Sequence, residues 1–228
     1  MCNFFAGMFK YPLFVPLVLY ILFFPPDSGL TQLLAPAVMR SLSFSVSEAI
    51  FQSFTFYIPA SSVVLYFYLQ DTPDLQLKKS PRVTCTGIIK FIFHAVSGAV
   101  ALLLIGGFIV FVEGLFPGMG FPAPDVEMPY SAAAIPTMLF YWICAAYLEE
   151  SFFRALLYGR LLLSGVKKIP AAVISAVFFA LCHAWEGHWG MAGAFLSGLF
   201  LSFMFERKKS LDCITASHAL YNITVYLL

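Results

Sequence analysis

The chain has 228 residues, of which 61% are hydrophobic and only 11% are charged, and its mean hydropathy is +0.86. A soluble globular domain carries about 25% charged residues, so this composition excludes a soluble protein and predicts an integral membrane protein. The formal net charge is +1 and the basic residues lie in short clusters between apolar runs, so we expect no nucleic-acid partner.

Apolar runs near the length of a membrane-spanning helix follow one another along the chain. They cover residues 11–24, 44–69, 87–112, 131–163, 169–185, 189–205 and 211–228. The stretch from Ser28 to Ser43 between the first two is either an interfacial helix or a further membrane segment. The sequence therefore predicts an all-α fold, a polytopic transmembrane bundle of about seven spans. Residues 1–130 would form an N-terminal part with three spans, and residues 131–228 a core with four.

The lysine and arginine residues predict the orientation of this bundle, because cytoplasmic loops carry an excess of them. Alternate loops hold these residues, and the other loops hold almost none. An N-terminus in the cytoplasm accounts for every cluster, and the small size favours a prokaryotic inner or plasma membrane. The basic residues concerned are Lys10, Lys78, Lys79, Arg82, Lys90, Arg160, Lys167, Lys168, Arg207, Lys208 and Lys209.

The fourth apolar run is interrupted by Glu149, Glu150 and Arg154. An ionisable residue at the centre of a bilayer costs about 2.5 to 17 kcal/mol, so such residues are rare and usually functional. Glu150 and Arg154 are four residues apart and can pair along one face of a helix. Glu149 points about 100° away from that face, which leaves its carboxylate free to act on a water molecule as a general base.

Two further polar pairs lie inside apolar runs: Phe179 with His183 in the fifth, and His218 with Asn222 in the seventh. The members of each pair are four residues apart and share a helix face. At about 1.5 Å per residue, Glu149, His183, His218 and Asn222 lie about 14 to 23 Å from the inner basic clusters, within the middle of the membrane. Because lipid offers polar groups no partner, we expect these side chains to meet in one site. A base, a water molecule and hydrogen-bond donors for an oxyanion would suit amide hydrolysis.

The motifs Glu149-Glu150-x-x-x-Arg154, Phe179-x-x-x-His183 and His218-x-x-x-Asn222, in this order on successive helices, resemble those of the CPBP intramembrane proteases. That family contains type II CAAX prenyl endopeptidases and bacteriocin-processing or self-immunity proteins, and the resemblance covers about residues 131 to 228. It implies a glutamate-dependent endopeptidase without a cofactor. Glu149 and His183 would activate water, His218 and Asn222 would form the oxyanion hole, and Glu150, Arg154 and Phe179 would support the site. Family members often have glycine after the arginine, where this chain has Ala155.

The implied substrate is a membrane-anchored protein or peptide reached within the lipid, and the sequence does not choose among substrates. An alternative enzyme is a zinc-dependent intramembrane metalloprotease in which Glu149, His183 and His218 hold Zn²⁺, since two histidines and a carboxylate can form an open catalytic zinc site. A further alternative is a membrane immunity protein that binds a peptide without cleaving it. The same polar residues can also be purely structural, as a buried ion network and an interhelical hydrogen-bonding pair.

Overall fold

The computed structural model describes residues 13–24, 42–43, 45–71, 85–119, 126–127, 129 and 131–228. Most of the stretch from Ser28 to Ser43 lies outside these residues, and so do the basic residues Lys10, Lys78, Lys79 and Arg82. Whether that stretch enters the membrane therefore stays a prediction.

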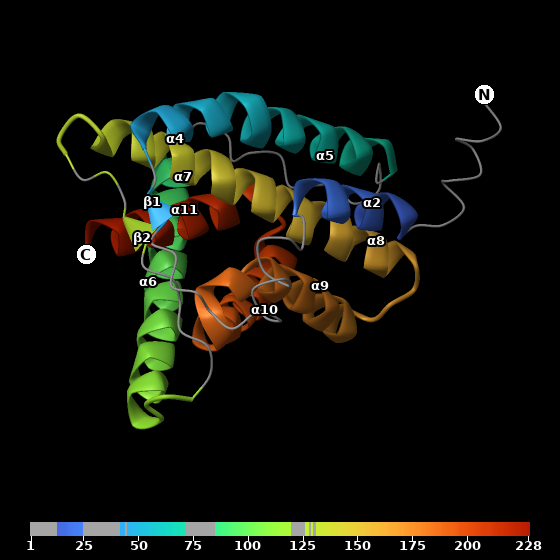
Figure 1. The fold of residues 1–228 in the computed structure, drawn as a ribbon. Coiled ribbons are helices and arrows are strands. Elements are labelled where there is room, and N and C mark those ends of the chain that lie inside the picture. The colour runs from blue at the N-terminus through green and yellow to red at the C-terminus, as the bar shows by residue number, and fades with distance from the viewer. Residues whose placement is uncertain are drawn as a thin grey trace.

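The described residues are almost entirely helical, as predicted (Figure 1). In chain order, the N-terminal part contains α2 (Phe14–Phe23), α4 (Val46–Gln52), a π-helical turn (Ser53–Tyr57), α5 (Ile58–Asp71) and α6 (Cys85–Leu115). The remainder contains α7 (Ile135–Glu150), a second π-helical turn (Ser151–Leu157), α8 (Tyr158–Leu163), α9 (Lys168–Cys182), a 3₁₀ turn (Ala184–Glu186), α10 (Gly187–Lys208) and α11 (Leu211–Leu227). Two short segments, β1 (Leu42–Ser43) and β2 (Val126–Glu127), pair in parallel and join the chain before α4 to the chain after α6.

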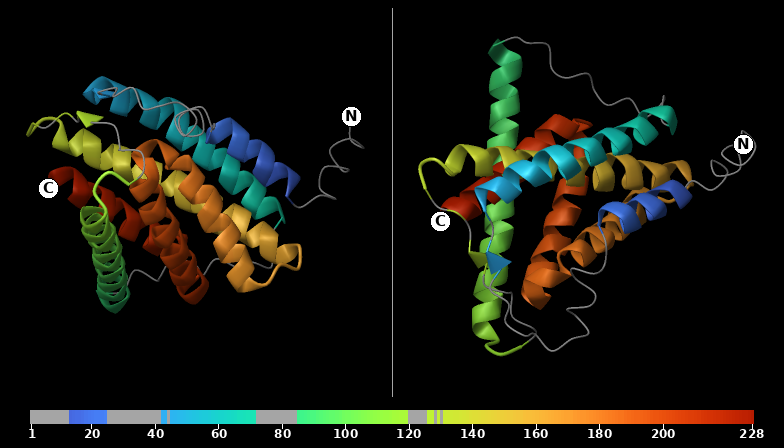
Figure 2. Two further views of the ribbon diagram at one scale, coloured as in Figure 1. Left: turned by 60° about the horizontal axis from the view of Figure 1, so that its bottom comes forward. Right: turned by 45° about the horizontal axis from the view of Figure 1, so that its top comes forward.

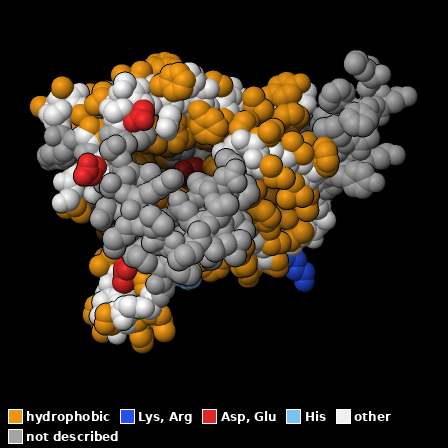
Figure 3. All heavy atoms as spheres, viewed as in Figure 1, with side chains coloured by type: hydrophobic (Ala, Val, Ile, Leu, Met, Phe, Trp, Pro, Cys, Tyr) orange, Lys and Arg blue, Asp and Glu red, His pale blue; other side chains and the backbone are white. Residues whose placement is uncertain are grey.

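Three helical stretches are long and apolar enough to cross a membrane, namely Val46–Gln70, Thr86–Leu115 and Ala184–Lys208. The helices Phe14–Phe23 and Lys168–Cys182 are apolar but shorter. Large apolar side chains such as Phe51, Phe93 and Leu104 are more than 60% exposed, and hydrophobic atoms cover much of the face drawn in Figure 3. A soluble protein rarely exposes so much apolar surface, so the chain is a helical membrane protein. The number of seven crossings stays a prediction.

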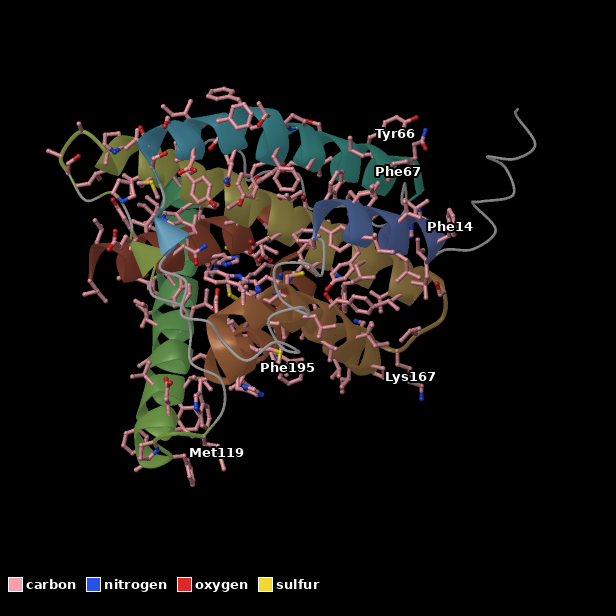
Figure 4. The ribbon with its side chains drawn as sticks, viewed as in Figure 1. Phe14, Tyr66, Phe67, Met119, Lys167 and Phe195 are labelled. Atoms are coloured by element: carbon pink, nitrogen blue, oxygen red, sulfur yellow. The ribbon has the colours of Figure 1, made fainter. Side chains whose placement is uncertain are left out.

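The helices around the centre of the bundle come from distant parts of the sequence (Figures 1 and 2). The continuous helix formed by α7, the second π turn and α8 lies beside α4 and α5, and α11 lies between α7 and α6. The pair α9 and α10 packs against α6, α8 and the π turn. The polar segment 149–154 thus lies where all these helices meet, and Figure 4 shows nitrogen and oxygen atoms gathered there.

The basic residues of several connections share one end of the bundle. Glu206, near the end of α10, pairs with Lys168 at 2.5 Å and with Lys209 at 2.6 Å. The amine of Lys208 lies 3.1 Å from Nε2 of His94, near the start of α6. At the other end of α6 and α10, the indole N–H of Trp189 donates to the carbonyl of Met119, which Figure 4 labels beyond α6. The positive-inside orientation requires this gathering of charge, and the sidedness itself stays a prediction.

The junction between the fifth and sixth apolar runs differs from the expectation. Helix α9 ends at Cys182, so Trp185 is not part of it, and the 3₁₀ turn Ala184–Glu186 leads directly into α10 at Gly187. Glu186 therefore belongs to a tight turn between two packed helices.

Candidate active site

The acidic pair stands at the point where α7 gives way to a π-helical turn. Glu149 and Glu150 are the last two residues of α7, and in the turn that follows the N–H of Tyr158 donates to the carbonyl of Phe153, five residues back. That carbonyl also accepts a hydrogen bond of 2.7 Å from the hydroxyl of Ser175 on α9. Single π-helical turns inside α-helices are rare and occur frequently at functional sites.

Glu150 is the centre of a buried ion network. Its Oε1 accepts hydrogen bonds from Arg154 at 3.1 Å and from Nδ1 of His218 at 2.7 Å, and both Glu150 and Arg154 are fully buried. The pairing of Glu150 with Arg154 is the one that their spacing predicts. His218, on α11, joins the pair from 68 residues away. Because a buried charge is tolerated only when it is paired, this network fixes α11 against α7.

Arg154 is held from the opposite side by α9 and α10. Its guanidinium lies 4.3 Å from the centre of the Phe179 ring and 3.5 Å from the carbonyl of Gly198. Gly198 permits the close packing of α9 against α10 at this point, because a Cβ at position 198 would lie 3.2 Å from both Ala176 and the Phe179 ring. The guanidinium is therefore enclosed by an aromatic face, a carboxylate and a carbonyl, and cannot turn toward Glu149 without losing them.

Glu149 is in a different situation from its neighbour. Its side chain is 19% exposed, and its Oε2 makes no hydrogen bond within the described part of the chain. The nearest charged partner of that oxygen is Nε2 of His218, at 3.7 Å. Oε2 of Glu150 likewise makes no hydrogen bond, but the Glu150 side chain is fully buried. Of the two carboxylates, Glu149 is therefore the one with an exposed part that a water molecule could approach.

The contacts of the two histidines define which ring nitrogen carries a proton. Nδ1 of His183 lies 2.8 Å from the carbonyl of Phe179, and Nδ1 of His218 faces the Glu150 carboxylate. Both partners only accept, so each Nδ1 carries the proton. Nε2 of His183 makes no hydrogen bond with any residue that the structure describes. In His218 both nitrogens face carboxylates, so a ring protonated on both would satisfy Glu149 and Glu150 together.

The ring of Phe179 lies close to both histidines of the candidate site, which the sequence does not indicate. Its ring centre lies 4.5 Å from that of His183 and 5.9 Å from that of His218, in addition to its contact with Arg154. The structure thus places both glutamates beside His218 and pairs Glu150 with Arg154. Phe179 lies against Arg154 and between the two histidines, and so joins His183 to the others. Asn222 lies one turn beyond His218 on α11, half-buried, and its carboxamide makes no hydrogen bond with any described residue.

One acidic residue near the site was missed by sequence reasoning. The N–H of Glu186 donates to the carbonyl of His183 at 3.0 Å, so the two residues belong to one tight turn, and a Cβ built on Gly190 would lie 2.4 Å from Cβ of Glu186. Its sequence neighbourhood, Trp185-Glu186-Gly187-His188, looks like a polar outer loop, so no pattern in the sequence connects it to the motifs.

The zinc alternative depends on how the possible metal ligands are arranged, and the metal dependence of the site stays a prediction. Among the described residues, no three His, Cys, Asp or Glu side chains are grouped as a metal site would require. Glu149, His183 and His218, the ligands considered for Zn²⁺, share the site without forming such a group.

Comparison with known families agrees with this geometry. Residues 131–224 match the family model described as type II CAAX prenyl endopeptidase Rce1-like, a span that includes all seven residues of the three motifs. The match covers less than half of the chain and confirms the resemblance on which the motifs were interpreted. No curated protein and no solved structure matches the chain.

Proposed function

We propose that this chain, which carries an Rce1-like domain at residues 131–224, is an intramembrane endopeptidase that cleaves a peptide bond in a membrane-anchored protein or peptide. The observation that supports this most is the contrast between the two adjacent glutamates. Glu150 is fully buried and accepts hydrogen bonds from Arg154 and His218, whereas the Glu149 side chain is 19% exposed and its Oε2 has only the longer contact of 3.7 Å with the His218 ring. A partly exposed carboxylate that no hydrogen bond commits to the structure is suited to act as a general base.

In the proposed mechanism, Glu149 takes a proton from a water molecule whose second hydrogen-bond acceptor is Nε2 of His183. The water oxygen attacks the carbonyl carbon of the scissile peptide bond, and negative charge develops on the carbonyl oxygen. His218, as an imidazolium between two carboxylates, and the carboxamide of Asn222 would donate hydrogen bonds to that oxyanion. The tetrahedral intermediate collapses when the C–N bond breaks and the leaving nitrogen receives the proton that Glu149 took from the water, which returns Glu149 to the carboxylate.

The supporting residues would keep this constellation in place. Arg154 balances the charge of Glu150, and Phe179 separates the two imidazoles while it covers the guanidinium. In the low dielectric of the membrane interior each of these interactions is stronger than in water, and an unbalanced charge is more costly. No metal ion is required for any of these steps.

The substrate and the membrane topology are parts of the same proposal. The family description indicates a prenylated substrate with a C-terminal CAAX sequence, and the apolar surroundings of the site suit such a lipid-anchored peptide. We further propose a cytoplasmic N-terminus, in agreement with the basic end around Glu206. Residues 1–130 would contribute three spans that flank the catalytic core, residues 131–228.

The test is cleavage of a farnesylated peptide that ends in a CAAX sequence. The peptide carries a fluorophore and a quencher on opposite sides of the bond to be cleaved. The purified protein in liposomes should cleave this peptide. The Glu149→Gln variant should cleave it about 10² to 10⁴ times more slowly, as expected for removal of a general base. Glu113→Gln is the matched control, because Glu113 is exposed near the end of α6. A Glu149→Gln variant as active as the wild type, or a wild-type protein that cleaves nothing, would overturn the proposal. Retained peptide binding without cleavage would favour the immunity-protein alternative instead.

A further inference from the structure

Helix α11, which carries His218 and Asn222, is held from two sides, because it lies between α7 and α6 (Figure 1). Toward α7 it is fixed by the hydrogen bond of 2.7 Å between His218 and Glu150. Toward α6 it presents Ser217 and Tyr221, each the residue just before one of the proposed oxyanion donors. These two are also four residues apart and share a second face of α11. The position of the donors therefore depends on α6 as well as on α7.

The backbone of α6 lies directly against Ser217 at Gly98. A Cβ built at position 98 would lie 2.4 Å from Oγ and 2.8 Å from Cβ of Ser217, and 3.0 Å from the terminal methyl group of Met204 on α10. Both Gly98 and Ser217 are buried. The Cβ of Ser217 is fixed to the backbone of α11 and cannot turn away, so only glycine fits at position 98 with the two helices at this separation.

Two other glycines of α6 show that this requirement is local. A Cβ at Gly106 would lie 3.2 Å from the hydroxyl of Tyr221, which is the far end of a side chain that can adjust. A Cβ at Gly107 would meet no atom within 4 Å. Of these three glycines, Gly98 alone faces atoms close to the backbone of α11.

A methyl group at position 98 would displace α11 from its place beside the site. The Ser217 Cβ, at 2.8 Å, has to move by about 0.6 Å before ordinary contact at 3.4 Å is reached. On its other side α11 already contacts α7 through the short hydrogen bond of His218, so the shift changes the position of that ring. A misplacement of about 1 Å in an active site can lower the rate about 10²-fold.

We propose that Gly98 is a positioning residue, whose missing side chain lets α6 hold α11 where His218 reaches both glutamates; this role rests on the proposed endopeptidase function. The distances that it maintains are 2.7 Å from His218 to Glu150 and 3.7 Å to Glu149. Gly98 lies outside residues 131–224, so the functional unit extends beyond the span of the family match. Because the proposed donors act on the oxyanion, their displacement affects kcat more than KM.

The experiment places alanine at three positions of α6 and measures cleavage of the farnesylated CAAX peptide. Gly98→Ala should lower kcat about 10- to 10²-fold with little change in KM, whereas Gly106→Ala should have a small effect. Gly107→Ala is the matched control and should keep the wild-type kcat. All three make the same change in helix propensity, so differences among them come from their contacts. If Gly98→Ala is as active as Gly107→Ala, α6 yields without moving α11 and the proposal is overturned.

A second substitution tests whether the contact with Ser217 is the cause. Ser217→Gly removes both of the closest atoms, so Gly98→Ala/Ser217→Gly should recover most of the kcat of Ser217→Gly alone. Ser217→Ala removes only Oγ and leaves Cβ at 2.8 Å, so Gly98→Ala/Ser217→Ala should stay impaired. No recovery with Ser217→Gly would contradict the proposal. Should Gly98→Ala not fold, Gly98→Ala/Ser217→Ala replaces it as the milder change: a lower kcat supports the proposal, and an unchanged kcat refutes it.

The unfolding midpoint Tm separates this proposal from the proposed function, because it requires no cleavage. His218→Ala should lower Tm, since it removes one partner of the buried Glu150 carboxylate. In the Gly98→Ala background the same substitution should lower Tm by less, because that hydrogen bond is already weakened. Equal decreases in the two backgrounds would refute the role of Gly98. If the decreases differ but the wild type cleaves no peptide, the proposed function fails while the effect of Gly98 on His218 stands.

Discussion

Replacing each of the two adjacent glutamates by glutamine should separate stability from catalysis. The change conserves shape and removes one charge, so any difference between the variants comes from the surroundings. Glu150 and Arg154 are both 0% exposed, and solvent does not screen their interaction. Breaking a buried pair by neutralising one partner costs about 3–5 kcal/mol, because the other charge remains buried. For a chain of this size, that corresponds to a decrease in Tm of about 6–20 °C.

Glu149→Gln should behave in the opposite way. The Oε2 atom of Glu149 has no hydrogen-bond partner to lose and its side chain is partly exposed, so we expect a change in Tm of less than about 3 °C together with loss of cleavage. A thiol-reactive fluorescent dye can follow unfolding, since Cys144 and Cys213 are buried free cysteines that react once the helices separate. Equal decreases in Tm for both variants, or a larger one for Glu149→Gln, would refute the assignment of the network to Glu150.

Ser175→Ala removes the donor to the Phe153 carbonyl and should cost about 1 kcal/mol, measured as a decrease in Tm of about 2–4 °C with the same dye. Glu206→Gln weakens two ion pairs whose carboxylate is partly exposed, so it should cost about 1 kcal/mol or less and leave the cleavage rate unchanged; a loss comparable to that of Glu150→Gln would contradict this. Prolonged treatment with a chelator should not reduce cleavage of the farnesylated peptide, and a loss that added zinc restores would instead favour the ligand set Glu149, His183 and His218.

The parts of the site that depend on local spacing were predictable from the sequence. The Glu150–Arg154 pair follows from an i, i+4 relation within one apolar run, and the helix that carries it extends over Ile135 to Leu163, close to the predicted 131–163. Hydrophobic runs of spanning length are a strong signal because the bilayer imposes their length. The family match of residues 131–224 likewise spans the three motifs that are visible in the sequence.

The parts that depend on contacts across the fold were not predictable. The π turn after Glu150 has no sequence signature, and the carbonyl of Phe153 at its centre receives a second hydrogen bond from Ser175, 22 residues away. The same applies to the tight turn that contains Glu186, which depends on the glycine conformation at 187 and on the absence of a side chain at Gly190. Backbone irregularities of this kind are stabilised by tertiary partners, and a periodicity argument that assumes a regular helix passes over them.

The role of His218 shows why adjacent residues of one type can differ in function. The helical periodicity alone separates Glu149 from Glu150 by direction, but both would be available as bases if nothing else approached them. His218 approaches from α11 and lies 2.7 Å from Glu150 and 3.7 Å from Glu149, so it completes a hydrogen bond with one and only an electrostatic contact with the other. Together with Arg154 it occupies Oε1 of Glu150, whose side chain is fully buried, whereas the side chain of Glu149 stays partly exposed. The assignment of the base therefore depends on the packing of α11 against α7, and a substitution that shifts α11 by about 1 Å should reduce cleavage while it leaves every residue of the three motifs unchanged.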